Sequence, residues 1–390
     1  MSMRNCKKEL ARRVLGAAGG MTIIIVMMMV AARPAQALVS ELSIPTAPWK
    51  ELDARSYAMG GAYTAVADGV AATYWNPAGL ATSPWLQLEV GLQPQVMGAD
   101  WQTMRLLWTE LNSGHPDPER IPDRVNATAT LNGGGGLAFR TAGAALWVQA
   151  AGQIVADKEA GSWQANAYYW VEGAAGGGLA APVSLPGLGR VAAGAAARRV
   201  VAGTTWVGQD PPVPQPGAGG NVRVTRTSMQ VNAAGNGLDL GIRMELSPRL
   251  VVAGVVKNLG LGLAGTATTR SEVVEYAGGE PQPPEVSERT QPFYQAVAPT
   301  WRVGVAVKPF LPGVVVAVDL EENRTMHVGG EWALPGRLVS LRAGAVVADS
   351  QAAEYRLGAG VKLGLLAADA AASWQQGRLK EGFLQAGLQF

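Results

Sequence analysis

Residues 238–246, LDLGIRMEL, alternate apolar side chains with polar or small ones. Because successive side chains of a β-strand point to opposite faces, this stretch predicts a strand with one apolar and one polar face. The apolar face carries Leu238, Leu240, Ile242, Met244 and Leu246. The other face carries Asp239, Gly241, Arg243 and Glu245. Such a strand separates an apolar environment from a polar one.

The same alternation recurs at residues 301–308, 326–332, 356–363 and 382–390. Aliphatic residues and tryptophan occupy one side of these stretches, and glycine and charged residues recur on the other. A soluble β-sandwich also alternates, but its apolar face points inward and its polar face meets water. In an outer-membrane barrel the apolar face meets lipid and the polar face lines the lumen. The repeated glycine and charge on one face favour the barrel, as does Phe390 on the apolar face of the last stretch.

The first 37 residues have the three parts of a secretory signal peptide. A basic start precedes an apolar core at residues 14–32 and an A-x-A cleavage pattern at residues 35–37. We expect cleavage near Ala37; the alternative is an uncleaved anchor helix, because the core approaches the length that spans a membrane. After residue 37 no uninterrupted run of about 20 apolar residues follows, which argues against further helical spans.

Removal of the signal changes the charge balance. It takes away six Lys or Arg and Glu9, which leaves 26 basic and 29 acidic residues, so the formal charge falls from +2 to −3. Electrostatics therefore do not support a nucleic-acid partner. The only cysteine, Cys6, leaves with the signal, so the exported chain has no disulfide. The full chain is 48% hydrophobic and only 16% charged, which is low for a water-soluble surface.

Turns and loops predict the number of strands. Short turns rich in proline or glycine fit the periplasmic side and occur at residues 246–250, 308–313 and 333–337. Long polar loops fit the outer side and occur at residues 109–126, 203–220 and 277–291. This assignment requires one long strand at residues 222–246. The sequence then predicts an all-β fold, an antiparallel transmembrane barrel of about 14 strands that begins near Leu86 and occupies residues 85–390.

Residues 38–84 lie between the signal and the first predicted strand. Their glycines and Asn-Pro turn predict a compact folded segment, and the barrel lumen is the natural place for it. Gly60 and Gly61 permit close backbone approach or positive φ angles. Asn76 can bond to nearby backbone, and Pro77 fixes one dihedral angle. These features suit a jointed plug that shifts to open a path, or a static plug that only fills the barrel.

The stretch ARSYAMGGAYTAVADGVAATYWNPAGLA, residues 54–81, resembles the N-terminal signature of the long-chain fatty-acid transporter (FadL) superfamily, including its PorV-like branch that serves type IX secretion. The resemblance continues at residues 237–260, at 327–344 and in the terminal strand, and it is weakest at about 109–235. It implies a 14-stranded outer-membrane barrel with an N-terminal hatch at residues 38–84. The hatch motif comprises Gly60, Gly61, Asn76, Pro77, Ala78 and Gly79.

Charged residues on the predicted inner face have two interpretations. They form a polar path or a brace for the hatch, or they are ordinary lumen residues that form ion pairs. They are Asp239, Arg243, Glu245, Arg302, Lys308, Asp319, Glu331, Arg342, Arg356 and Lys362. The two histidines, His115 and His327, are far apart in sequence, so we expect no metal site, no catalytic triad, no cofactor and no enzyme. The GLGLAG sequence at 260–265 lacks the following helix that a dinucleotide-binding motif needs.

The leading functional expectation, implied by the resemblance, is passive uptake or export of fatty-acid-like hydrophobic small molecules past the hatch, across a barrel that contacts outer-membrane lipid. The alternative is a PorV-like accessory protein that binds exported proteins as its partner. A structural barrel with a permanently closed plug is a third possibility. A water-filled general porin fits less well, because the hatch would block it.

Overall fold

A computed structural model describes residue 44 and residues 53–97, 124–159, 162–185, 189–209, 213–214, 222–277, 280–348 and 352–389. The predicted signal peptide with its cleavage position near Ala37, most of the long loop at 109–126, and Phe390 lie outside the described residues. Among the residues that the structure describes, no helix is long and apolar enough to cross a membrane.

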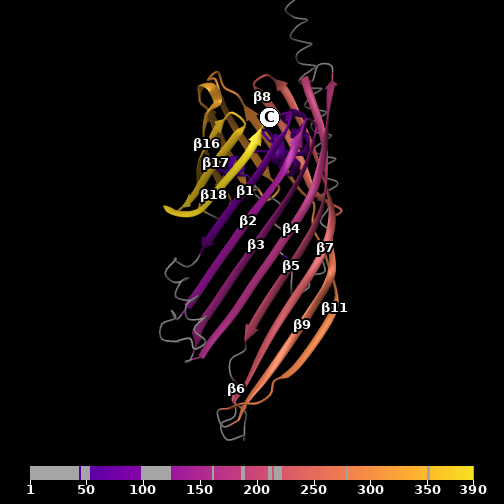
Figure 1. Cartoon of the computed structure of the whole chain (residues 1–390), viewed down its shortest axis with the longest axis vertical. Helices are drawn as coiled ribbons and strands as arrows, with labels where there is room; N and C mark the ends of the chain where they lie inside the picture. Colours follow the sequence, from indigo (N-terminus) through magenta and orange to yellow (C-terminus); the bar gives the residue numbers. More distant parts are fainter. Residues whose placement is uncertain are drawn as a thin grey trace, which may run out of the picture.

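The described chain is dominated by antiparallel strands that form a closed barrel of 14 strands (Figure 1). The strand segments are β1 (Gln87–Met97), β2 (Arg124–Phe139), β3 (Ala142–Glu159), β4 (Ser162–Leu185), β5 (Gly189–Gln209), β6 (Val213–Pro214), β7 (Val222–Ser247), β8 (Leu250–Leu259), β9 (Gly262–Ala277), β10 (Glu280–Pro281), β11 (Glu285–Ala296), β12 (Thr300–Val307), β13 (Val314–Glu321), β14 (Met326–Ala333), β15 (Val339–Val347), β16 (Glu354–Leu363), β17 (Leu366–Gln375) and β18 (Arg378–Gln389). The barrel closes where β1 pairs with β18, with Leu88 opposite Leu388.

Three barrel strands are interrupted, β5 with β6, β8 with β9, and β10 with β11 and β12, which is why 18 segments make 14 strands. β8 and β9 pair with successive parts of β7, and β12 and β11 pair in turn with β8 and β9. Near the break between β8 and β9, Asn258 at the end of β8 and Gly260 in the break have φ angles of 64° and 69°. These left-handed conformations interrupt the strand without ending the sheet. The predicted long strand at 222–246 is confirmed by β7, which has 26 residues.

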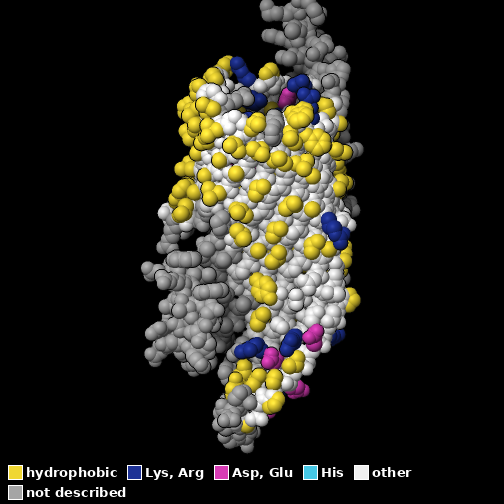
Figure 2. All heavy atoms as spheres, in the orientation of Figure 1, with side chains coloured by type: hydrophobic (Ala, Val, Ile, Leu, Met, Phe, Trp, Pro, Cys, Tyr) yellow, Lys and Arg dark blue, Asp and Glu magenta, His cyan; other side chains and the backbone are white. Residues whose placement is uncertain are grey.

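The alternation of the sequence separates the two faces of the barrel. On β16, Tyr355 and Leu357 are 62% and 54% exposed, whereas Arg356 between them is 8% exposed and points inward. Hydrophobic side chains are scattered over the outer surface of the barrel (Figure 2). The predicted apolar outer face and charged inner face are therefore confirmed, because an inward arginine between outward apolar or aromatic side chains is the pattern of a lipid-facing wall.

The wall of the barrel differs greatly in height. β4, β5 and β7 have 24, 21 and 26 residues, whereas β12, β13 and β14 have eight each. In Figure 1 the long strands extend far beyond the end of the short ones. On β7 the outward residues change from Leu238 and Leu240 to Gln230 and Asn232, all exposed. The far part of β7 is therefore polar on its outer face.

The N-terminal segment, which we define as residues 53–84, lies inside the barrel. It contains α2 (Ala54–Ala58), α3 (Gly69–Trp75) and the 3-10 helix η1 (Pro77–Thr82). A separate 3-10 turn, η2 (Pro335–Arg337), connects β14 and β15 and is not part of this segment. α2 contacts β15 to β18, α3 contacts β1 to β4, and η1 contacts β3, β4, β5 and β7. Because strands from several sides of the barrel surround it, the segment fills the lumen at this level.

If the outer face contacts lipid, a charged substitution on it destabilises the folded barrel by an amount that depends on its depth in the bilayer. Leu357→Arg places a guanidinium in the middle of the outer face of β16 and is expected to destabilise folding into lipid vesicles by about 2–4 kcal/mol. Leu311→Arg, in the exposed turn between β12 and β13, is expected to cost only about 0–1 kcal/mol. Urea titration of vesicle-folded protein measures both, and equal costs would contradict the assignment.

Candidate functional site

The N-terminal segment turns sharply after α2, and the barrel binds this turn through its backbone. Gly60 and Gly61 have φ angles of 65° and 77°, a region that favours glycine. Their carbonyl oxygens point at the wall: Arg302 Nη1 donates to Gly61 O at 2.8 Å, and His327 Nδ1 lies 2.6 Å from Gly60 O. The two glycines therefore present acceptors to the inner faces of β12 and β14.

Arg302 is the centre of a buried polar cluster. Its side chain is 1% exposed, forms an ion pair with Glu321 and lies 4.8 Å from the Trp75 ring. Nε2 of His327 lies 2.8 Å from the same Glu321 carboxylate. A buried guanidinium requires this kind of pairing, because an unpaired charge away from water is strongly destabilising.

Asp319 binds the next residues of the segment. One oxygen of its fully buried carboxylate accepts hydrogen bonds from the backbone N–H groups of Tyr63 and Thr64, at 2.9 and 2.8 Å. From β7, Arg243 Nε donates to Ala65 O at 3.3 Å and its Nη1 donates to Glu245 at 2.7 Å. Residues 60–65 are thus held to β7, β12, β13 and β14 by charge-assisted hydrogen bonds.

The Asn-Pro turn is a second anchor. The Asn76 side chain accepts from Ala78 N at 3.1 Å, which caps η1, and donates to Thr64 O at 3.0 Å and to Ile242 O on β7 at 3.2 Å. Pro77 occupies the first position of η1, where no backbone donor is needed. A Cβ atom at Gly241 would overlap the Asn76 amide, and one at Gly194 would overlap the Pro77–Ala78 peptide. Glycines in the wall therefore let this turn approach the strands.

A third cluster joins α2 to β14, β15 and β17. Arg55 donates to both Glu331 oxygens at 2.7 and 2.9 Å and to Asp68 at 2.9 Å. Arg342 donates to Glu331 at 2.6 Å and pairs with Asp369. Two arginines therefore share one glutamate, which ties the segment to the wall.

The other predicted inner-face residues have separate environments. Arg356 donates to Glu354 at 2.6 Å and lies 4.4 Å from the Tyr57 ring, so it also contacts the segment. Asp239 pairs with Arg198 and accepts from Asn258 N at 2.9 Å. Lys362 is half-buried on β16. Lys308 is exposed and follows the last residue of β12, so it lies in a turn rather than on the inner face.

In the hatch motif, Ala78 and Gly79 are buried beside Asn76 and Pro77. A Cβ atom at Gly79 would overlap the carbonyl of Ala67. The 3-10 helix η1 therefore packs directly on the residues that precede α3. Sequence analysis did not select Arg55 or Glu321, although both take part in the clusters above. His327 alternates with Met326 and Val328, and this alternation predicts its position on the inner face.

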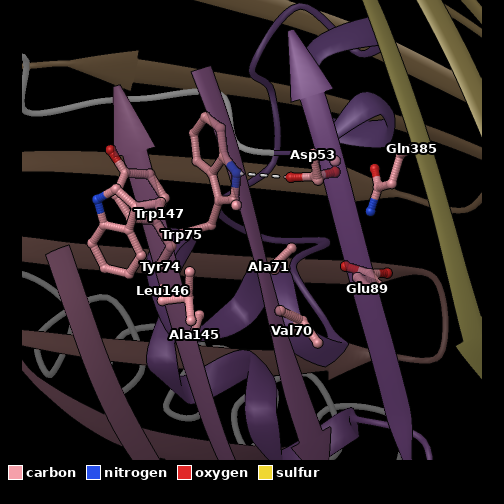
Figure 3. Close-up of a pocket in the computed structure, with 13 residues that line it drawn as sticks. Asp53, Val70, Ala71, Tyr74, Trp75, Glu89, Ala145, Leu146, Trp147 and Gln385 are labelled. Carbon is pink, nitrogen blue, oxygen red and sulfur yellow. Dashed lines mark hydrogen bonds between the residues drawn. The ribbon is translucent and has the colours of Figure 1, made fainter. Parts of the chain in front are cut away.

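A small cavity lies between α3 and the strands β1, β2 and β3, beside the positions where α3 contacts these strands. Its volume is about 30 Å³, enough for one or two water molecules and well below the volume of ligand pockets. Aromatic residues Tyr74, Trp75 and Trp147 lie on one side in Figure 3, and Asp53, Glu89 and Gln385 lie on the other. Burial raises the pKa of the Asp53 carboxyl, although Ser56 and Trp75 donate to it. The cavity is thus apolar and aromatic on one side and acidic on the other.

No family model matches the sequence, and no curated protein matches it. Solved structures do match in fold. The toluene transporter TodX of Pseudomonas putida aligns with a TM-score of 0.57 and 14% identity over 86% of this chain and 98% of its own. The toluene transporter TbuX of Ralstonia pickettii aligns with a TM-score of 0.56 and 14% identity over 86% of this chain and 98% of its own. A Pseudomonas aeruginosa FadL homologue aligns with a TM-score of 0.52 and 13% identity over 87% of this chain and 98% of its own.

This chain has the fold of the FadL-type channels. The comparison confirms the barrel that the sequence predicts, and at these identities it concerns the fold alone.

Adjacent glycines on β14 provide a matched test of this site. A Cβ atom at Gly329 would overlap Met59 of the segment, whereas one at Gly330 would meet only Val315 O at 3.6 Å. Gly329→Val is expected to cost about 1–3 kcal/mol through overpacking and to expose Arg55 to trypsin, whereas Gly330→Val leaves both unchanged. Thermal unfolding and limited proteolysis in detergent measure the difference; indistinguishable variants would show that the segment does not pack on β14 in this way.

Proposed function

We propose that this chain is an exported outer-membrane channel for passive movement of hydrophobic small molecules, with the N-terminal segment as its hatch. The carrying observation is the cavity between α3 and the strands β1 to β3, lined by Tyr74, Trp75 and Trp147. TodX and TbuX, which share the fold, are named toluene transporters. The exposed apolar residues of the outer wall fit contact with outer-membrane lipid.

The segment is held unevenly, and this supports a gate. Charged side chains of β7, β12, β13 and β14 bind residues 55 and 60–65. On the opposite side, α3 meets β1 to β3 beside unfilled space, through apolar and small residues such as Val70 and Ala145. Apolar contacts are not directional, so α3 can shift against this wall while the charged anchors hold the preceding turn. The opening would then lie at the aromatic cavity.

A PorV-like role with an exported protein as partner has no supporting observation in the described residues. The channel proposal accounts for the cavity and for the uneven anchoring together. It needs no cofactor, and the described residues contain no group of three or more His, Cys, Asp or Glu arranged to hold a metal ion.

A disulfide between α3 and β3 tests the gate. A Cβ atom at Gly143 would lie 2.6 Å from Thr73 Oγ1, so Thr73→Cys with Gly143→Cys brings two thiols within bonding range. Cells producing this variant are expected to take up radiolabelled toluene at the vector-only rate when oxidised and at the wild-type rate after reduction. Each single-cysteine variant under the same oxidant is the control.

Two results would count against this proposal. Wild-type-rate uptake by the fully oxidised double variant would show that α3 need not move. Uptake by wild-type cells no faster than by vector-only cells would show that the barrel does not conduct this probe.

A further inference from the structure

Three turns at one end of the barrel expose large apolar side chains. At the upper end in Figure 1, where β18 ends, the turn between β12 and β13 carries Phe310 and Leu311, which are 84% and 67% exposed. The next turns along the short wall expose Leu338, between β14 and β15, and Leu365, between β16 and β17. Turns are normally polar, and clustered apolar side chains on a surface mark an interaction site.

Comparable turns elsewhere in the barrel are polar. At the same end, the long strands β2 and β3 are joined by Arg140 and Thr141. At the opposite end of the short wall, β13 and β14 are joined by residues 322–325, of which Glu322 and Arg324 are exposed. In these comparisons the apolar turns accompany the short strands and lie at one end of them.

The strands of the short wall are too short to cross the apolar layer of a membrane by themselves. β12, β13 and β14 have eight residues each. At about 3.4 Å per residue and a tilt of about 40°, such a strand rises about 20 Å, less than the apolar band of about 25 Å on outer-membrane barrels. The 16 residues of β2 exceed this height. Apolar side chains in the turns therefore add apolar height where the strands lack it.

Backbone hydrogen bonds join the apolar turns to one another. Ala333 N donates to Gly313 O at 2.9 Å, and Lys362 N donates to Leu338 O at 2.8 Å. We define the short-wall rim as residues 308–313, 334–338 and 363–366. The three turns therefore form one surface along the end of the short wall.

The short-wall rim continues the outer face of the strands. Leu363 and Leu366 lie opposite each other at the ends of β16 and β17, and both are exposed. Leu363 shares the strand parity of the outward residue Leu357. Hydrophobic side chains are dense at this end of the barrel in Figure 2. The rim is thus continuous with the surface that faces lipid.

Two basic residues lie beside the rim. Lys308 N donates to Arg249 O at 2.8 Å, so the turn between β7 and β8 adjoins the turn between β12 and β13. The Arg249 guanidinium carbon lies 3.7 Å from the centroid of the Phe310 ring, and both basic residues are exposed. Cationic donors next to exposed apolar side chains match the phosphate and acyl parts of a phospholipid.

We propose that the short-wall rim inserts into the boundary between head groups and acyl chains of the leaflet at this end of the barrel, where Arg249 and Lys308 bind phospholipid phosphates. A phospholipid leaflet is the partner that fits the apolar and the cationic parts of this surface together. The inference goes beyond the proposed channel function, because it concerns how the barrel sits in the bilayer and needs no movement of α3.

Spin labels on single cysteines test the insertion. Cys6 is the only cysteine, so a Cys6→Ser background has no other labelling site. Nitroxides are placed in the rim by Leu311→Cys and Leu365→Cys, in polar turns by Arg140→Cys and Glu322→Cys, and in the middle of the wall by Leu357→Cys. The protein is folded into phosphatidylcholine–phosphatidylglycerol vesicles. Oxygen relaxes labels in hydrocarbon, and a water-soluble nickel chelate relaxes labels in water.

The ratio of oxygen to nickel relaxation reports the depth of each label. It is expected to exceed one at residues 311 and 365, to be higher still at 357, and to fall below one at 140 and 322. Ratios below one at both rim positions would place the turns in water and overturn the proposal. Protection of both rim labels from oxygen and nickel alike would show that protein, such as a second copy of this chain, covers the rim, and would also overturn it.

Brominated lipids test the phosphate contact separately. A fluorophore on Leu311→Cys is expected to be quenched at least about threefold more strongly by brominated phosphatidylglycerol than by brominated phosphatidylcholine, because cations concentrate anionic lipid nearby. Arg249→Gln with Lys308→Gln is expected to bring this ratio close to one. Arg140→Gln with Arg190→Gln, which removes two exposed cations at the same end of the long wall, is expected to keep it. Equal quenching by both lipids with Arg249 and Lys308 intact would overturn the phosphate contact.

Discussion

Closure of the sheet is the constraint on which the rest of this structure depends. A sheet that spans a lipid bilayer must pair every backbone donor and acceptor, and a closed barrel is the arrangement that leaves no edge. The pairing of β1 with β18 achieves this and creates an interior. Once the interior exists, each strand must place one set of side chains there, which is why residues such as Arg302, Asp319 and Glu331 alternate with outward valine, leucine and tryptophan.

The interior is filled by the N-terminal segment, and its two sides are built differently. On one side, buried charges recognise backbone groups of the sharp turn at Gly60 and Gly61, and such contacts require a fixed geometry. On the other side, α3 faces an aromatic cavity in which packing is incomplete. Directional anchors on one side, and non-directional apolar packing beside a small cavity on the other, fit a gate, because movement on one side need not break the contacts on the other.

Much of the fold could be predicted because alternation is a local property. The outward position of Leu357 and the inward position of Arg356 follow from strand period alone. Lys308 shows the limit of this argument: it shares the parity of Arg302, but β12 ends at Val307 and the lysine lies in the turn. The partners of the inner charges could not be predicted, since the contact between Arg302 and Gly61 spans 241 residues and depends on register. Glu89 was missed although it alternates with Leu88 and Val90, a signal that the sequence contains.

The central claim is that the segment moves at α3 while its glycine turn stays anchored. Hydrogen–deuterium exchange of the detergent-solubilised protein, with and without saturating toluene, measures this most directly, because exchange reports local opening of backbone hydrogen bonds. The account predicts faster exchange in peptides covering residues 69–75 when toluene is present, with no change at residues 60–65. Equal exchange in both regions, or faster exchange at residues 60–65 alone, would contradict it.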